Sequence, residues 1–250
     1  MIIKKTPEQI EKMFQAGRAL ASVVKQLRDA VLPGVTTAEL DELARRLMTE
    51  KQATPSFLGY KGYPASICAS PNDVIVHGIP TEQKLLEGDI VSVDFGLILD
   101  GWHADTAYTY PVGEVSDEAA RLLEVTEKAL AAGIEECRPE NRLYDISAAI
   151  QEVVEKAGFS VVREYAGHQI GREMHEGEVQ VPNYGRRGHG LWLEPGMVFA
   201  IEPMVNIGDW RTQVLDDGWA VVTADGSLSA HFEHTVAVTP AGPHVLTALS

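Results

Sequence analysis

Residues 90–110 read IVSVDFGLILDGWHADTAYTY. Two runs of aliphatic, aromatic and threonine side chains flank Asp100-Gly101, a dipeptide typical of a two-residue hairpin turn. We therefore predict antiparallel strands over residues 90–99 and 103–110. In that register residue 96 faces residue 105, which makes Asp94 and Asp105 diagonal neighbours on one face of the sheet. A bulge or a three-residue loop would instead turn one of the two acids to the other face.

Asp94 has apolar neighbours on both sides along its strand. Burying an unpaired carboxylate there is unfavourable, so a positive group is expected beside it. If the hairpin register holds, the side chains of Asp94 and Asp105 can both reach one bound cation.

Two helices are expected before the hairpin. Thr6 and Gln9 have capping-box spacing, with Pro7 at the first helical position, and this helix should end before Pro33. Thr36 and Glu39 form a second capping box that opens the next helix.

The same order of elements follows the hairpin. Apolar residues recur at helical spacing over residues 116–136 and 143–157. Strands are then predicted at residues 197–202, around 219–223, and at 231–239.

Local sequence supports an internal duplication. Residues 88–94, GDIVSVD, align with residues 196–202, GMVFAIE, and each block ends in a carboxylate. Residues 106–113, TAYTYPVG, align with residues 235–242, TVAVTPAG, and Asp105 or Glu233 stands just before each. We predict a mixed α+β fold in a single catalytic domain spanning residues 1–250, with halves of about 1–113 and 114–250.

The four aligned acids are Asp94, Asp105, Glu202 and Glu233. Each acid alone could pair with an arginine, but Arg163, Arg172 and Arg211 all lie in flanking segments. A divalent metal is the better counter-charge for the four together, and oxygen ligands with one imidazole suit Mn, Fe(II), Co or Zn.

His168 is the expected imidazole ligand because glycines surround it. His77 and His175 have similar settings and are candidate hydrogen-bond donors or acid/base groups. The other five histidines are assigned to the surface or to packing: His103, His189, His231, His234 and His244.

Composition narrows the choice of partners and compartment. The 250 residues carry a formal net charge of −15, which argues against a nucleic-acid groove or an anionic membrane surface as a partner. Cys68 and Cys137 are the two cysteines, so no disulfide framework is expected. No signal peptide or long apolar run is evident, and we predict a cytoplasmic protein.

Several further motifs lie along the sequence: FLGYKGYP (57–64), VHGIP (76–80), DFG (94–96), DGWHADT (100–106), GH (167–168), IEPM (201–204) and SAHFEHT (229–235). On these motifs the sequence resembles the type I methionine aminopeptidases, which have the pita-bread fold, over nearly its whole length. The implied fold is a pseudo-two-fold pair of helix-helix-strand halves around a curved antiparallel sheet.

The resemblance implies a role for each site residue. Asp94, Asp105, His168, Glu202 and Glu233 would hold two divalent metals. Glu202, His175 and His77 would be catalytic, with both histidines contacting the peptide. The pocket for the methionine side chain would be lined by Tyr60, Tyr63, Cys68, Met174 and Trp219.

The implied activity is removal of the initiator methionine from nascent polypeptides whose second residue is small. A hydroxide bridging the metals would attack the first peptide bond, with Glu202 transferring the proton. The implied partners are nascent peptide N-termini and, transiently, the ribosome, and the implied state is a monomer.

Two departures and two alternatives accompany this resemblance. Gln169 stands where many members have glycine, and its larger side chain would crowd the metal edge. Met174 stands where many members have phenylalanine.

The alternative functions are a proline-directed aminopeptidase or dipeptidase of the same fold, and a non-catalytic module that binds peptides.

Overall fold

The computed structural model describes residues 2–249. Four α-helices form two pairs: α1 (Pro7–Arg28) with α2 (Thr37–Glu50), and α3 (Asp117–Glu135) with α4 (Leu143–Lys156). A short 3₁₀ turn, η1, covers Tyr60–Gly62. None of the helices within residues 2–249 has the length and apolar character needed to cross a lipid bilayer.

The large sheet is antiparallel throughout and has the strand order β1-β4-β5-β14-β9-β7-β8, with β2 on β4 and β15 on β14. Its strands are β1 (Thr54–Pro55), β2 (Ile67–Pro71), β4 (Ile90–Leu99), β5 (Trp102–Pro111), β7 (Ala166–Gln169), β8 (Gln180–Pro182), β9 (Val198–Ile201), β14 (Glu233–Thr239) and β15 (Gly242–Val245).

Two three-stranded sheets complete the fold. The order β13-β10-β6 joins Ser229–His231, Met204–Asn206 and Ser160–Val161. The order β11-β12-β3 joins Thr212–Val214, Val221–Thr223 and Val74–Val76.

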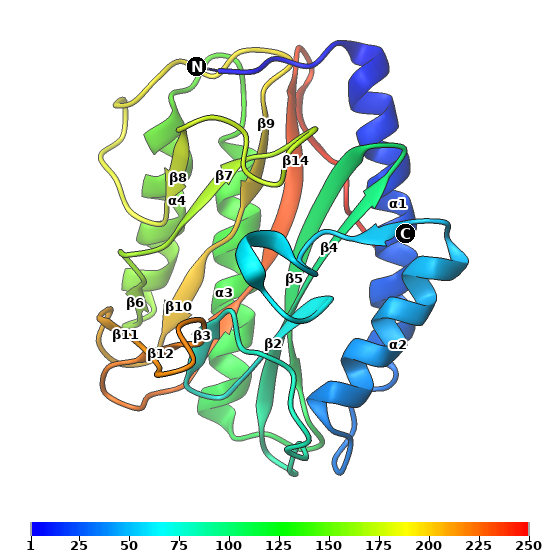
Figure 1. Ribbon diagram of the computed structural model, residues 1–250. Coiled ribbons are helices and arrows are strands. Elements are labelled where there is room, and N and C mark those ends of the chain that lie inside the picture. The colour runs from blue at the N-terminus through cyan, green and yellow to red at the C-terminus, as the bar shows by residue number, and fades with distance from the viewer. Residues whose placement is uncertain (1, 250) are drawn as a thin grey trace.

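The helix pairs pack against equivalent parts of the large sheet (Figure 1). One buried apolar cluster joins α1 and α2 to β4 and β5, and another joins α3 and α4 to β9 and β14. The strands β4-β5 and β14-β9 meet where β5 pairs with β14. This arrangement confirms the predicted pseudo-two-fold pita-bread architecture, while the residue boundaries of the two halves stay a prediction.

The predicted helix starts are confirmed. The Thr6 backbone N–H donates to Gln9 Oε1 at 2.9 Å, and the Thr36 backbone N–H donates to Glu39 Oε2 at 2.7 Å. Both threonine hydroxyls accept from the third helical N–H in return, so each capping box is complete.

The hairpin register is also confirmed. Leu99 pairs with Trp102 and Gly96 pairs with Asp105. Asp100 and Gly101 have φ values of 51° and 75°, the left-handed conformation at both central positions of a type I′ turn. The second strand extends one residue further at each end than predicted.

Two predicted strands differ from the structure. The strand expected over residues 197–202 ends at Ile201, because Pro203 has no N–H to continue the ladder. The strand expected over 231–239 is broken at Phe232, whose N–H donates to Pro203 O at 3.4 Å. There the chain passes from the β13-β10-β6 sheet to the large sheet.

Candidate active site

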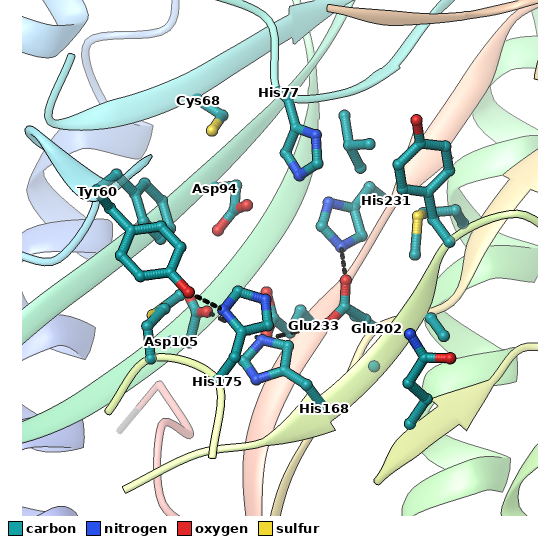
Figure 2. Close-up of a pocket in the computed structure, with 18 of the residues that line it drawn as sticks. Tyr60, Cys68, His77, Asp94, Asp105, His168, His175, Glu202, His231 and Glu233 are labelled. Atoms are coloured by element: carbon teal, nitrogen blue, oxygen red, sulfur yellow. Dashed lines mark hydrogen bonds and ion pairs between the residues drawn. The ribbon is translucent and has the colours of Figure 1, made fainter. Parts of the chain in front are cut away.

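A cavity of about 410 Å³ opens over the middle of the large sheet (Figure 2). Residues from both halves of the chain line it. They include every site residue predicted from the sequence: Tyr60, Tyr63, Cys68, His77, Asp94, Asp105, His168, Met174, His175, Glu202, Trp219 and Glu233. The structure therefore brings the predicted set together, whereas the role of each member stays a prediction.

Strand register places the acids in a row. Asp94 on β4 and Glu233 on β14 both pair with Ala107 on β5, one from each side. Directly paired residues on neighbouring strands point to the same face, as do residues two apart along a strand, so Asp105 joins this face. Glu202 directly follows Ile201, the partner of His234, and thus adjoins Glu233.

The four carboxylates have no cationic partner among residues 2–249 other than nearby histidines. His168 Nε2 lies 3.8 Å from Asp105 Oδ2 and 3.6 Å from Glu202 Oε1. One oxygen of each acid is buried without any hydrogen-bond partner: Asp94 Oδ1, Asp105 Oδ1, Glu202 Oε1 and Glu233 Oε1.

The three arginines considered as alternative partners are engaged elsewhere. Arg172 stacks over Trp102 at 4.1 Å, and Arg211 pairs with Asp209 at 2.6 Å. Arg163 lies over the ring of Trp210 at 5.0 Å. The interpretation of the acids as ordinary ion-pair partners therefore fails.

Burial controls the electrostatics of the cluster. It raises the pKa of Asp94 to about 7. It also raises the pKa values of Asp105, Glu202 and Glu233, and repulsion between the neighbouring carboxylates adds to this effect. Such a cluster is stabilised by protons or by cations.

The His168 ring has the tautomer that a metal ligand needs. Its Nδ1 lies 3.1 Å from the Gln169 carbonyl oxygen, which can only accept, so Nδ1 donates and Nε2 keeps its lone pair. Burial lowers the pKa of His168 to about 3, which keeps the ring neutral.

The donor set fits a divalent metal. Ligand atoms of Asp105, His168 and Glu233 lie within 4.8 Å of one another, and all three side chains are buried. Carboxylate oxygens with one neutral imidazole match the preferences of Mn, Fe(II), Co or Zn. The buried carboxylate oxygens that have no hydrogen-bond partner also support this fit, because a bound cation would satisfy them.

His175 stands beside this cluster. Its Nδ1 lies 2.9 Å from the Tyr60 hydroxyl, and the two rings stack with centroids 5.6 Å apart. The His168 ring centroid is 4.0 Å away on the other side. Burial lowers the pKa of His175 to about 4, so a neutral imidazole faces the cavity.

Part of the cavity wall is apolar. Tyr63, Cys68 and Met174 are buried there, and Trp219 packs edge-on against Tyr63 with ring centroids 5.0 Å apart. Tyr63 uses its hydroxyl to donate to backbone oxygens, including that of Gly78 at 2.9 Å, which leaves its ring as apolar surface. This wall suits a flexible apolar side chain.

His77 enters the cavity from a strained backbone position. It is a non-glycine residue with φ at 61°, and its ring packs edge-on against Tyr165 at 5.8 Å. Burial lowers the pKa of His77, which favours the neutral form of this imidazole.

Sequence reasoning missed His231. The sequence assigns it to the surface or to packing, but the structure buries it in the cavity with Nε2 at 3.9 Å from Glu202 Oε2 (Figure 2). Its position two residues before Glu233 was the available signal, because alternate strand residues share a face.

Gln169 does not line the cavity, in contrast to the crowding expected from the sequence. It follows His168 on β7, where successive side chains point to opposite faces. Its amide is fully buried and has no hydrogen-bond partner among residues 2–249.

The chain is similar to known metallopeptidases. Residues 11–240 match the model of metallopeptidase family M24. A methionine aminopeptidase of Clostridium perfringens is 52% identical over 247 residues, covering 99% of each chain. The crystal structure of methionine aminopeptidase from Rickettsia prowazekii superposes with a TM-score of 0.97 at 46% identity, covering 99% of this chain and 100% of that one.

A more distant likeness bears on the proline-directed alternative. The Xaa-Pro dipeptidase from Bacillus anthracis has a TM-score of 0.79 at 23% identity, over 98% of this chain and 61% of that one. At this identity the likeness shows a shared fold and nothing about substrate.

Proposed function

The chain belongs to the methionine aminopeptidases of metallopeptidase family M24, and on that premise we propose that it removes the initiator methionine from nascent polypeptides whose second residue is small. The observation that carries the proposal is the cluster of four carboxylates, with Asp105 and Glu233 fully buried, and one neutral imidazole beside an apolar pocket. Metal use follows from the family, whereas the number of ions, their ligands and the catalytic roles are our own proposals.

We assign two divalent ions to the site, held by Asp94, Asp105, His168, Glu202 and Glu233. Two ions carry +4 and balance the −4 of the four carboxylates, whereas one ion would leave two negative charges buried. Co, Mn, Fe(II) and Zn all suit this donor set. When bound, such ions polarise the scissile carbonyl and lower the pKa of water.

The chain's own groups would handle the proton and the substrate. Glu202 lines the cavity, has one oxygen without a hydrogen-bond partner among residues 2–249, and is assigned the transfer of the water proton to the leaving amine. His175, oriented by Tyr60, would donate to the developing oxyanion. His77 would hold the leaving peptide.

The apolar wall would select the substrate side chain. Methionine is long, unbranched and polarizable, and the rings of Tyr60, Tyr63 and Trp219 with Cys68 and Met174 offer matching surface. The preference for a small second residue is carried over from the family resemblance.

Neither alternative is favoured. The Xaa-Pro dipeptidase from Bacillus anthracis shares the fold at 23% identity, while the methionine aminopeptidase of Clostridium perfringens is 52% identical. A non-catalytic peptide-binding module has no need for a complete acid cluster together with His77 and His175.

Turnover assays test the activity. Chelated protein reloaded separately with each metal is expected to cleave Met-Ala-Ser and to leave Xaa-Pro peptides intact. Asp94→Ala should lose metal and activity together, and His175→Ala should keep metal while losing most turnover. Faster cleavage of Xaa-Pro peptides, or no cleavage with any metal, would overturn the proposal. Elemental analysis should find two ions per chain.

We further propose that the protein is a cytoplasmic monomer with one catalytic domain, which meets its substrates during transient contact with the ribosome. Light scattering would give the mass of one chain. Sedimentation with translating ribosomes at low salt would test the association.

A further inference from the structure

We propose that a buried ion pair between Lys5 and Glu176 positions His175, which makes Lys5 and Glu176 positioning residues of the active site. The inference deepens the proposed function, since it rests on the role assigned to His175. It concerns two residues that lie 171 positions apart in the sequence.

The pair is enclosed by the protein. The side chains of Lys5 and Glu176 are 1% and 4% exposed, and Lys5 Nζ donates to Glu176 Oε2. Nζ also donates to the Ile3 carbonyl at 3.3 Å. Separating the two side chains would leave each charge buried without its partner, which is unfavourable. The pair therefore fixes both side chains.

Glu176 fixes the loop that carries His175. Its Oε1 accepts from the Arg172 backbone N–H at 2.6 Å, and its own N–H donates to Gln169 O at 2.8 Å. Gly171 leaves the space for this arrangement, because a Cβ there would collide with the Glu176 carboxylate and lie 2.6 Å from Lys5 Cε. The loop from Gln169 to Glu176 is thereby held from within and by Lys5.

Lys5 is itself anchored to the turn that precedes β9. Its backbone N–H donates to Gly196 O at 2.7 Å, and a Cβ on Gly196 would lie 2.7 Å from Lys5 O. Gly196 in turn donates to Val238 O on β14 at 3.0 Å. The N-terminal segment therefore links the His175 loop to the strand that carries Glu233.

The effect reaches the cavity through one peptide bond. His175 directly precedes Glu176, and its ring lies between the Tyr60 hydroxyl and the His168 ring. A displacement of about 1 Å at a group that acts on the reacting atoms can lower turnover roughly 100-fold. The ion pair therefore affects catalysis without touching the substrate.

A neighbouring ion pair provides a matched control. Lys4 pairs with Glu194, but these side chains are 46% and 51% exposed. Exposed pairs contribute little to stability, and no hydrogen bond or ion pair within residues 2–249 joins this one to the loop from Gln169 to Glu176.

The test compares Lys5→Met/Glu176→Gln with Lys4→Met/Glu194→Gln in the metal-loaded enzyme, using Met-Ala-Ser. Removing both charges of the buried pair avoids leaving one uncompensated. We expect kcat of the first variant to fall roughly 10- to 100-fold with KM changed less than about 3-fold. The control should keep kcat within about 2-fold of the parent. Unchanged kcat in the first variant would overturn the proposal.

A double-mutant cycle separates positioning from a general loss of structure. In a His175→Ala background, Lys5→Met/Glu176→Gln should lower kcat by less than about 2-fold, because the group that it positions is absent. A fall in kcat as large as in the parent background would show that the ion pair does not act through His175.

A second variant and an NMR measurement test the same proposal by other routes. Gly171→Ala presses a methyl group against the pair without changing its charge, and it should reproduce the loss of kcat if the double variant does not fold. The ¹⁵N chemical shifts of the His175 ring, compared between the chelated parent and the double variant, report its position without turnover. Unchanged shifts would contradict positioning, whereas absent turnover in the parent would contradict only the proposed function.

Discussion

Asp94 and Glu233 are both cross-strand partners of Ala107, one on each side of β5. All three side chains point to the same face of the sheet, so a single methyl group lies between two carboxylates. Ala107 is fully buried. The size of this side chain therefore limits the room between the acids.

Ala107→Val is predicted to weaken metal binding by roughly 10- to 100-fold, the range seen when groups around metal ligands are altered. The two added methyl groups would occupy space that the carboxylates need to converge on a cation. Ala107→Gly leaves that space open and is the control, at a cost of about 1 kcal/mol in strand stability. Calorimetric titration with Mn²⁺ measures both affinities, and equal affinities would contradict the prediction.

The chelated protein is predicted to lose stability, relative to Asp94→Asn, as pH rises from about 4 to 7. Burial holds the pKa of Asp94 at about 7, against a usual value of 3.8, so the folded state binds more protons than the unfolded state in this window. The contribution of Asp94 to the unfolding free energy therefore falls as pH rises, by a few kcal/mol.

Urea unfolding with chelator measures this difference at each pH. The matched variant is needed because burial lowers the pKa of His234 to about 4, and that histidine acts in the opposite direction in the same window. Saturating Mn²⁺ should stabilise the wild type more than Asp94→Asn. A wild-type protein that gains stability relative to Asp94→Asn between pH 4 and 7 would contradict the assignment.

Tyr60→Phe is predicted to lower kcat about 3- to 10-fold with little change in stability. The substitution removes the hydroxyl that lies 2.9 Å from His175 Nδ1 but keeps the stacked ring. A single hydrogen bond of this kind contributes about 1 kcal/mol. Tyr184→Phe, at an exposed tyrosine that does not line the cavity, is the control for kinetics and thermal unfolding. Equal kcat values for the two variants would remove the assigned role of Tyr60.

His77→Asn is predicted to fold with a stability within about 1 kcal/mol of the parent, whereas His77→Val should lose about 1–3 kcal/mol more. The reason is the φ of 61° at residue 77, which asparagine tolerates and a β-branched residue does not. Both variants should lose turnover, since both lack the imidazole. Chemical unfolding that gave the two variants equal stability would show that the backbone relaxes at this position.

Local features of the sequence were sufficient to predict much of the fold. The capping boxes at Thr6 and Thr36 and the Asp100-Gly101 turn depend on neighbouring residues, and all three formed as predicted. The diagonal relation between Asp94 and Asp105 followed from the turn because strand register is fixed once the loop length is known.

The break at Phe232 could not be predicted in the same way. Residues 231–239 alternate like one strand, but at the break the Phe232 N–H donates to the carbonyl oxygen of Pro203, a distant residue. His231 directly precedes this break, and its contact with Glu202 joins segments that are distant in the sequence. Its spacing from Glu233 was therefore the local signal for a place in the site.

The sequence alone therefore determined which side chains have the chemistry for the site, because acids within apolar strands are unfavourable without a counter-charge wherever they fold. Only the tertiary structure decided how those side chains meet. It placed Asp94 and Glu233 on either side of Ala107 and brought Lys5 against Glu176, because pairing between distant strands and segments is set by packing of the whole chain and not by local spacing.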